Sequence, residues 1–100
     1  MDYYNKDFIN IEIIFNILSK HPELRIKKHK EKTLLFLEGL YVVMRSGMAW
    51  RMIDKKYGKW NSIFRRYLRW TNRGIFEWLR LELIESKLEK STENFFLRKL

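Results

Sequence analysis

Five polar residues between positions 62 and 73 recur at helical spacing and have side chains that can bind a nucleic acid. They are Ser62, Arg65, Arg66, Arg69 and Arg73. An arginine guanidinium can donate two parallel hydrogen bonds to the edge of a guanine, or it can bind a phosphate. At about 100° per residue, this spacing places all five on one side of a helix, together with Asn72. The opposite side is predicted to face a core and carries Trp60, Ile63, Phe64, Tyr67, Trp70 and Thr71.

Positive charge is concentrated around this helix. Residues 45 to 73 contain nine lysines and arginines and the single acid Asp54, a net charge of +8, and the whole chain carries +9. A solvated basic face without a partner is the alternative interpretation, but so dense a charge favours an anionic ligand. We expect Ser62, Arg66 and Arg69 to read base edges. The expected phosphate contacts are Arg51, Lys55, Lys56, Lys59, Arg65 and Arg73.

Two short helices are predicted to position these side chains. The first is expected from Trp50 to Tyr57, closed by Gly58, because glycine can adopt the left-handed conformation that ends a helix. The second is expected to begin near Asn61-Ser62, whose side chains can cap a first turn, and to end near Arg73. A helix, a glycine turn and a second helix are typical of a helix-turn-helix.

The remaining apolar segments predict three more helices: Asn10 to Ser19, Glu31 to Ser46, and Gly74 to about Lys90. Gly39 lies inside the second of these, which suggests that another helix crosses closely there. The predicted fold is therefore all-α, a compact bundle of about five helices containing the helix-turn-helix. Residues 1–90 are expected to form a single DNA-binding domain, and residues 91–100 a loose tail or a short terminal helix. Its predicted core includes Leu40, Val43, Trp50, Phe64, Tyr67 and Trp70.

Other functional classes find little support in the sequence. The chain has no cysteine, and His21 and His29 have no second ligand at a useful spacing, so we predict no metal site and no cofactor. We find no glycine-rich phosphate loop, nucleophile elbow or paired carboxylates, and therefore expect no catalytic residues. The longest apolar run is too short for a membrane span, and the polar first residues lead us to expect no leader peptide. A cytoplasmic protein is expected.

Residues 36–79 resemble the N-terminal domain of bacterial insertion-sequence transposases. The resemblance rests on four consecutive motifs, FLEGLYVVMRSG, GMAWRMI, KYGKWNSIFRRYLRW and GIFEWL. The family commonly has Leu-Pro where this chain has Ile53-Asp54. The resemblance implies a nucleoid-associated protein that recognises the terminal inverted repeats of a mobile element in double-stranded DNA. It also implies that strand cleavage belongs to a separate ribonuclease-H-like domain with an Asp, Asp, Glu metal site, which we expect to be absent from this chain.

Three other functions remain open. The chain could be a helical protein-interaction module that forms a weak homodimer or pairs with a catalytic transposase subunit. It could be a small DNA-binding regulator derived from a transposase. It could also bind RNA, although the aromatic residues of the second helix fall opposite its arginines, where a core would take them.

Residues 25–32, with the sequence RIKKHKEK, form a basic connection between two predicted helices. The simpler interpretation is a solvated loop followed by a first helical turn. The alternative is an additional arm that contacts phosphates.

Overall fold

The computed structural model describes residues 11–85, which contain helices and turns and no strand. The first helical segment covers residues 11–18. It is followed by the 3₁₀-helix η1 (Lys27–His29), α2 (Lys30–Ser46), the 3₁₀-helices η2 (Trp50–Met52) and η3 (Lys55–Tyr57), α3 (Trp60–Asn72) and α4 (Ile75–Glu85). The all-α fold class is thus confirmed. The predicted tail over 91–100 and the last residues of the helix predicted to reach Lys90 lie outside the described residues.

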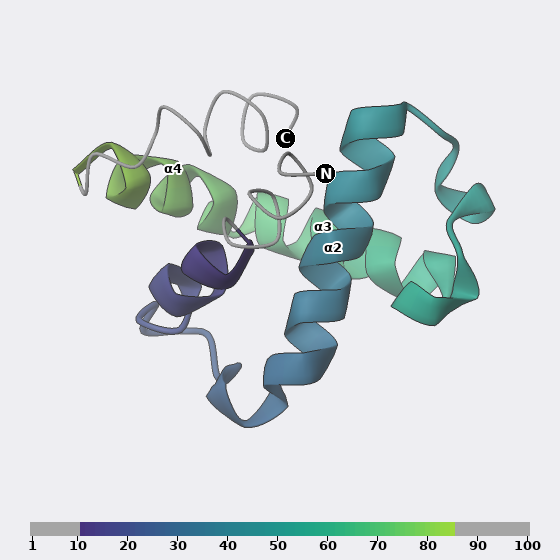
Figure 1. Cartoon of the computed structure of the whole chain (residues 1–100). Coiled ribbons are helices and arrows are strands. Elements are labelled where there is room, and N and C mark those ends of the chain that lie inside the picture. The colour runs from purple at the N-terminus through teal and green to yellow at the C-terminus, as the bar shows by residue number, and fades with distance from the viewer. Residues whose placement is uncertain (1–10, 86–100) are drawn as a thin grey trace, which may run out of the picture.

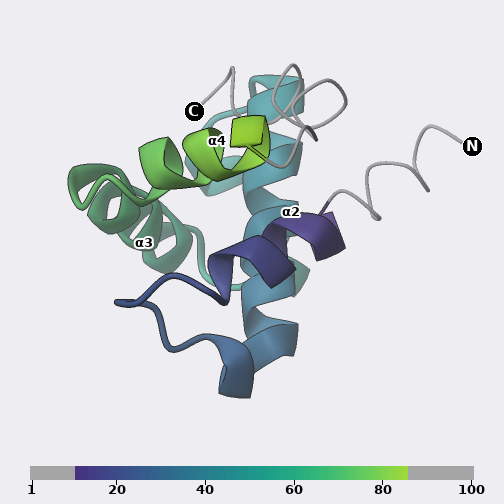
Figure 2. The same cartoon turned by 90° about the vertical axis from the view of Figure 1, so that its left-hand side faces the viewer.

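Helix α2 is the central element. It stands upright in Figure 1, with α3 crossing behind it, and the view in Figure 2 shows α4 and the segment 11–18 also crossing it. Its residues Leu37 and Leu40 are completely buried, as are Leu79 and Leu83 of α4. The helix ends at Gly47, whose left-handed backbone (φ 73°) lets its N–H donate to the Val43 carbonyl. The other helices therefore pack around one long helix, whose residues from Leu34 to Met44 include the single charged residue Glu38.

The prediction of one helix from Trp50 to Tyr57 is wrong. This segment forms two three-residue 3₁₀-helices, separated by Ile53 and Asp54 in extended conformation. An Asp54 carboxylate oxygen accepts a hydrogen bond of 2.8 Å from the Lys56 N–H, which is the way a short acidic side chain caps a new turn instead of continuing a helix. The φ of Asp54 is −62°, close to the value that proline imposes, so the backbone at this position would also accept a proline.

The start of α3 also differs from the prediction. The helix begins at Trp60, and its N-cap is Lys59, which makes no side-chain capping bond. The preceding Gly58 has φ 114° and ψ −179°, a combination open only to glycine, and it turns the chain directly into the helix. Asn61 and Ser62 therefore lie inside the first turn, and both are exposed to solvent.

Gly39 marks a close approach, as predicted, but the crossing segment is the irregular connection from Ile53 to Tyr57. A Cβ atom at Gly39 would lie 3.1 Å from Ile53 Cδ1 and 3.3 Å from Tyr57 Cβ. These separations are tighter than ordinary van der Waals contact. The glycine thus lets the connection before α3 pack directly on α2.

The predicted core is confirmed for Leu40, Val43 and Trp70, which are buried. Trp50 and Tyr67 are partly buried against this core, and the ring of the half-buried Phe64 lies 5.3 Å from the ring of Trp50. Further along α3, the ring centre of Trp70 lies 5.1 Å from that of Phe36 in α2 and 5.8 Å from that of Phe76 in α4. Two residues assigned to the inner side, Trp60 and Thr71, are instead exposed.

Candidate nucleic-acid interface

The solvent-facing side of α3 is polar and basic. Its exposed residues are Asn61, Ser62, Arg65, Leu68, Arg69 and Asn72, and Arg73 follows directly after the helix. Within residues 11–85, the ion pairs join Lys30 to Glu12 and Arg80 to Glu77, so no described carboxylate neutralises this side. In the structure, Ser62, Arg65, Arg69 and Arg73 therefore lie on a common exposed surface, as predicted.

Arg66 lies in a different environment. One of its guanidinium nitrogens, Nη2, donates a hydrogen bond of 3.3 Å to the hydroxyl of Thr33, which is completely buried in α2. The guanidinium carbon lies 4.4 Å from the centre of the Phe36 ring and 4.9 Å from that of Trp70. Arg66 thus joins α3 to α2 through the hydrogen bond to Thr33 and the cation–π contact with Phe36, and it also contacts Trp70 of its own helix.

The helical angle explains why Arg66 and its neighbour Arg65 differ. At about 100° per residue, Arg66 is only about 40° around the helix from the buried Trp70, whereas Arg65 is about 140° away from it. Burial lowers the pKa of the Arg66 guanidinium, and the nearby positive charge of Arg69 lowers it further. Arg66 remains charged at neutral pH but has fewer free donors for a base than Arg65 or Arg69.

We expect Arg66→Ala to reduce the free energy of unfolding by about 1–3 kcal/mol, because it removes the contacts with Thr33, Phe36 and Trp70. The matched control is Arg65→Ala, which removes an exposed arginine from the same helix and should change stability by less than about 0.5 kcal/mol. Urea denaturation followed by circular dichroism measures both. Equal stability of the two variants would contradict the role of Arg66 between the helices.

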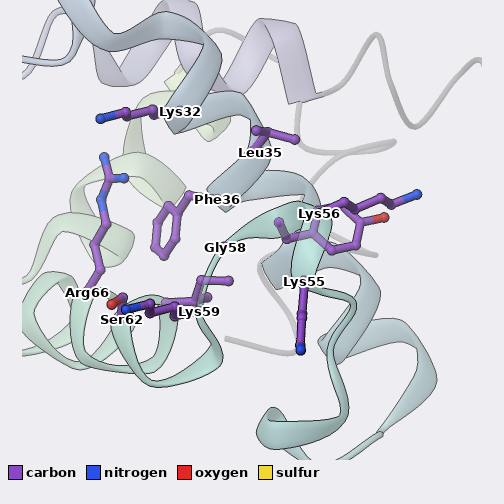
Figure 3. Close-up of a pocket in the computed structure, with 11 residues that line it drawn as sticks. Lys32, Leu35, Phe36, Lys55, Lys56, Gly58, Lys59, Ser62 and Arg66 are labelled. Atoms are coloured by element: carbon purple, nitrogen blue, oxygen red, sulfur yellow. The ribbon is translucent and has the colours of Figure 1, made fainter.

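Three of the predicted phosphate contacts line a hollow of about 340 Å³ between α2 and α3 (Figure 3). Figure 3 shows Lys59 beside Ser62 at the start of α3, Lys55 and Lys56 on the connection before it, and Arg66 reaching from α3 toward Lys32 of α2. The complete lining consists of Lys32, Leu35, Phe36, Lys55, Lys56, Tyr57, Gly58, Lys59, Ser62, Ile63 and Arg66. Its described lining includes no carboxylate, so the hollow suits an anion.

Lys56 differs from Lys55 and Lys59. Its ammonium nitrogen lies 5.0 Å from the centre of the Tyr57 ring. Glu38 of α2 is near enough to feel its charge: burial raises the pKa of Glu38, and the positive charge of Lys56 acts in the opposite direction. The positive charge of Lys56 thus interacts with Tyr57 and Glu38 of the protein itself. Lys55 and Lys59 have no such contacts in the described part of the chain.

A second hollow, of about 410 Å³, lies on the other side of Arg66. It is lined by Leu24, Arg25, Ile26, His29, Lys32, Arg66, Arg69 and Trp70. Three basic residues here, Arg25, His29 and Lys32, were not among the predicted site residues. Their signal in the sequence was the basic run over residues 25–32, but nothing in its spacing indicated that it folds beside α3.

Other predicted contacts lie outside both hollows. Arg51, in η2, and Arg65 and Arg73 are exposed but line neither of them. His21 packs edge-on against Trp78 at 4.6 Å, and its Nδ1 accepts a hydrogen bond from the Glu23 N–H. Among residues 11–85, no group of three or more histidines and acids is arranged to hold a metal ion. None of the helices formed by these residues is both long and apolar enough to span a membrane.

Comparison with known proteins supports the resemblance seen in the motifs. Residues 11–80 match a family described as "Putative transposase of IS4/5 family". A relative from Sinorhizobium fredii (strain NBRC 101917 / NGR234), described as "Uncharacterized protein y4sN", is 38% identical over 43 residues, which are 43% of this chain and 34% of that protein. The match thus spans about a third of the relative's length. No solved structure matches the chain.

Proposed function

Because this chain belongs to the IS4/5 transposase family, we propose that it binds double-stranded DNA and recognises the terminal inverted repeats of an insertion element. The resemblance assigns strand cleavage and joining to a separate domain, so the role proposed for residues 11–85 is recognition alone. Helix α3 would enter the major groove, whose width admits an α-helix.

One observation carries this proposal: the exposed side of α3 is basic and uncompensated, while its opposite side is fixed in the core by aromatic contacts. A helix held in this way presents its arginines in a defined orientation. RNA-binding surfaces commonly stack bases on exposed aromatic rings. On α3 the rings of Tyr67 and Trp70 face inward, and Trp60, at the first position of the helix, is the one exposed aromatic residue. This arrangement favours duplex DNA over single-stranded RNA.

The geometry refines which residues would read sequence. Ser62, Arg65 and Arg69 are exposed on the side of α3 that faces away from the core, and we propose them as the principal contacts to base edges. The prediction that Arg66 reads a base stays a prediction, and its contacts with α2 favour a positioning role instead. Arg51, Lys55, Lys59 and Arg73 are proposed to contact phosphates, and Lys56 to contribute less.

We expect Arg69→Ala to weaken binding to the element's own terminal repeat by about 1–3 kcal/mol and to relax the base preference at one position of that repeat. The matched variant is Lys59→Ala, which removes a charge beside the same helix and should weaken the terminal repeat and a scrambled duplex of equal length alike. Fluorescence anisotropy with both duplexes at several salt concentrations separates the two effects. If the wild-type chain binds neither duplex at about 50 mM salt, the proposed function is wrong. If Arg69→Ala weakens both duplexes equally, only its assignment as a base reader fails.

A further inference from the structure

The two hollows beside α3 meet at Lys32 and Arg66, which line both of them. The two neighbouring hollows are here called together the α2–α3 trough, with α3 as one wall. The opposite wall is formed by the first turns of α2 and by the basic connection before it, through Lys32 and Arg25. Lys55 and Lys59 lie at one end of the trough, and Arg69 lies toward the other.

We infer that the α2–α3 trough binds the phosphodiester backbone of one DNA strand, flanking the groove that receives α3, and that Arg25 and Lys32 are part of the DNA-binding surface. This inference rests on the proposed function and deepens it. It assigns a role to the connection over residues 25–32, which lies outside the helix predicted to read bases.

The electrostatics of the trough support a polyanion as its occupant. No carboxylate is among the described residues that line it, and cationic side chains stand on both walls. Arg66 and Arg69 repel each other, which contributes to the lowered pKa of Arg66. A phosphate between the walls would relieve this repulsion, whereas a neutral ligand would not.

The dimensions of the trough also fit a strand. From Lys59 to Arg69 the α3 wall extends over ten residues, or about 15 Å at 1.5 Å per residue. A strand of B-DNA advances about 3.4 Å per nucleotide along the duplex axis, so this wall matches about four nucleotides. The trough is therefore long enough for several consecutive phosphates and not for one phosphate alone.

The structure provides a matched control within the basic connection. Lys32 and Arg25 line the trough, whereas Lys28 is exposed and lines neither hollow. Lys28→Gln and Lys32→Gln each remove one exposed charge from neighbouring turns, and neither residue has a described ion-pair partner. The variants therefore differ in where the charge is removed and not in how much charge is lost.

The test measures the affinity of the full chain for the terminal repeat and for a scrambled duplex, by fluorescence anisotropy between about 50 and 200 mM salt. We expect Lys32→Gln to weaken both duplexes by the same factor, about five- to tenfold at about 0.1 M salt, and to reduce the slope of log Kobs against log salt by about 0.9. The double variant Arg25→Gln with Lys32→Gln should reduce that slope by about 1.8, while Lys28→Gln leaves it unchanged. Methylphosphonate substitution of consecutive phosphates should map this loss to one strand on one side of the site.

Three outcomes would contradict the role inferred for the trough. If the wild-type chain binds duplex DNA but Lys32→Gln and Lys28→Gln behave alike, the trough is not a backbone site and the proposed function stands. If Lys32→Gln loses binding to single-stranded DNA but binds the duplex as the wild-type chain does, the inference that the trough binds a strand of duplex DNA is also wrong. If the wild-type chain binds no duplex, both the inference and the proposed function are wrong.

Discussion

Replacing Trp70 with alanine is expected to reduce the free energy of unfolding by about 3–5 kcal/mol. Trp70 is only 4% exposed, and its ring contacts Phe36 of α2, Phe76 of α4 and the guanidinium of Arg66. The substitution leaves a cavity where three elements meet, and it removes one of the two rings that hold Arg66. Urea denaturation measures the loss, which is a large fraction of the 5–15 kcal/mol typical of a whole domain.

The matched control is Trp60→Ala, a change of the same residue type in the same helix. Trp60 is 42% exposed at the first position of α3, so its removal should cost about 1 kcal/mol or less. From periodicity alone both tryptophans belong to the inner side, and only the structure separates them. Equal losses for the two variants would contradict the orientation of α3 described above.

Helical periodicity predicted most of the fold correctly. Arg65 and Arg69 face solvent and Trp70 is buried because these residues obey the helical angle within a single helix. The burial of Leu37 and Leu40 follows from the same argument, since they lie in the nearly apolar part of α2 between Leu34 and Met44. The burial or exposure of these residues could therefore be predicted from their spacing within a single helix.

The connection before α3 could not be predicted in the same way. Its apolar residues fit a helix, but a hydrogen bond from the Lys56 N–H to the Asp54 carboxylate outweighs that weak preference. The Ile53 side chain then packs on Gly39, fourteen positions earlier in the sequence, and this contact stabilises the extended conformation. Short segments take their structure from such tertiary contacts more than from intrinsic propensity.

The candidate site shows the same limit. Arg66 and Thr33 are 33 positions apart, and no spacing rule links them, so the sequence did not distinguish Arg66 from its neighbouring arginines. The basic connection carrying Arg25 and Lys32 was recognised as charged, but its position beside α3 depends on how the whole bundle packs. The sequence thus favours an anionic ligand, and the fold is needed to say which cations lie near one another.

Raising salt from about 50 to 200 mM is expected to weaken binding of the terminal repeat by about 10³- to 10⁴-fold. Each lysine or arginine that neutralises a phosphate releases condensed counterions, which contributes about −0.9 to the slope of log Kobs against log salt. The cations proposed as phosphate contacts, which lie after α3, on the connection before it and in the trough, make about six to seven contacts reachable, for a slope of about −5 to −6. They are Arg25, Lys32, Arg51, Lys55, Lys59 and Arg73, with a smaller contribution from Lys56.

The size of this slope tests whether the two walls of the trough act as one surface. If α3 and the connection before it acted without Arg25 and Lys32, the slope would be smaller by about 1.8. A Lys55→Gln and Lys59→Gln double variant should lower it by a similar amount, because these lysines have no described carboxylate partner to rearrange. A wild-type slope shallower than about −2 means that no more than two phosphates are neutralised. That result would leave most of the basic surface without a role and would contradict the docking of α3 with a flanking strand.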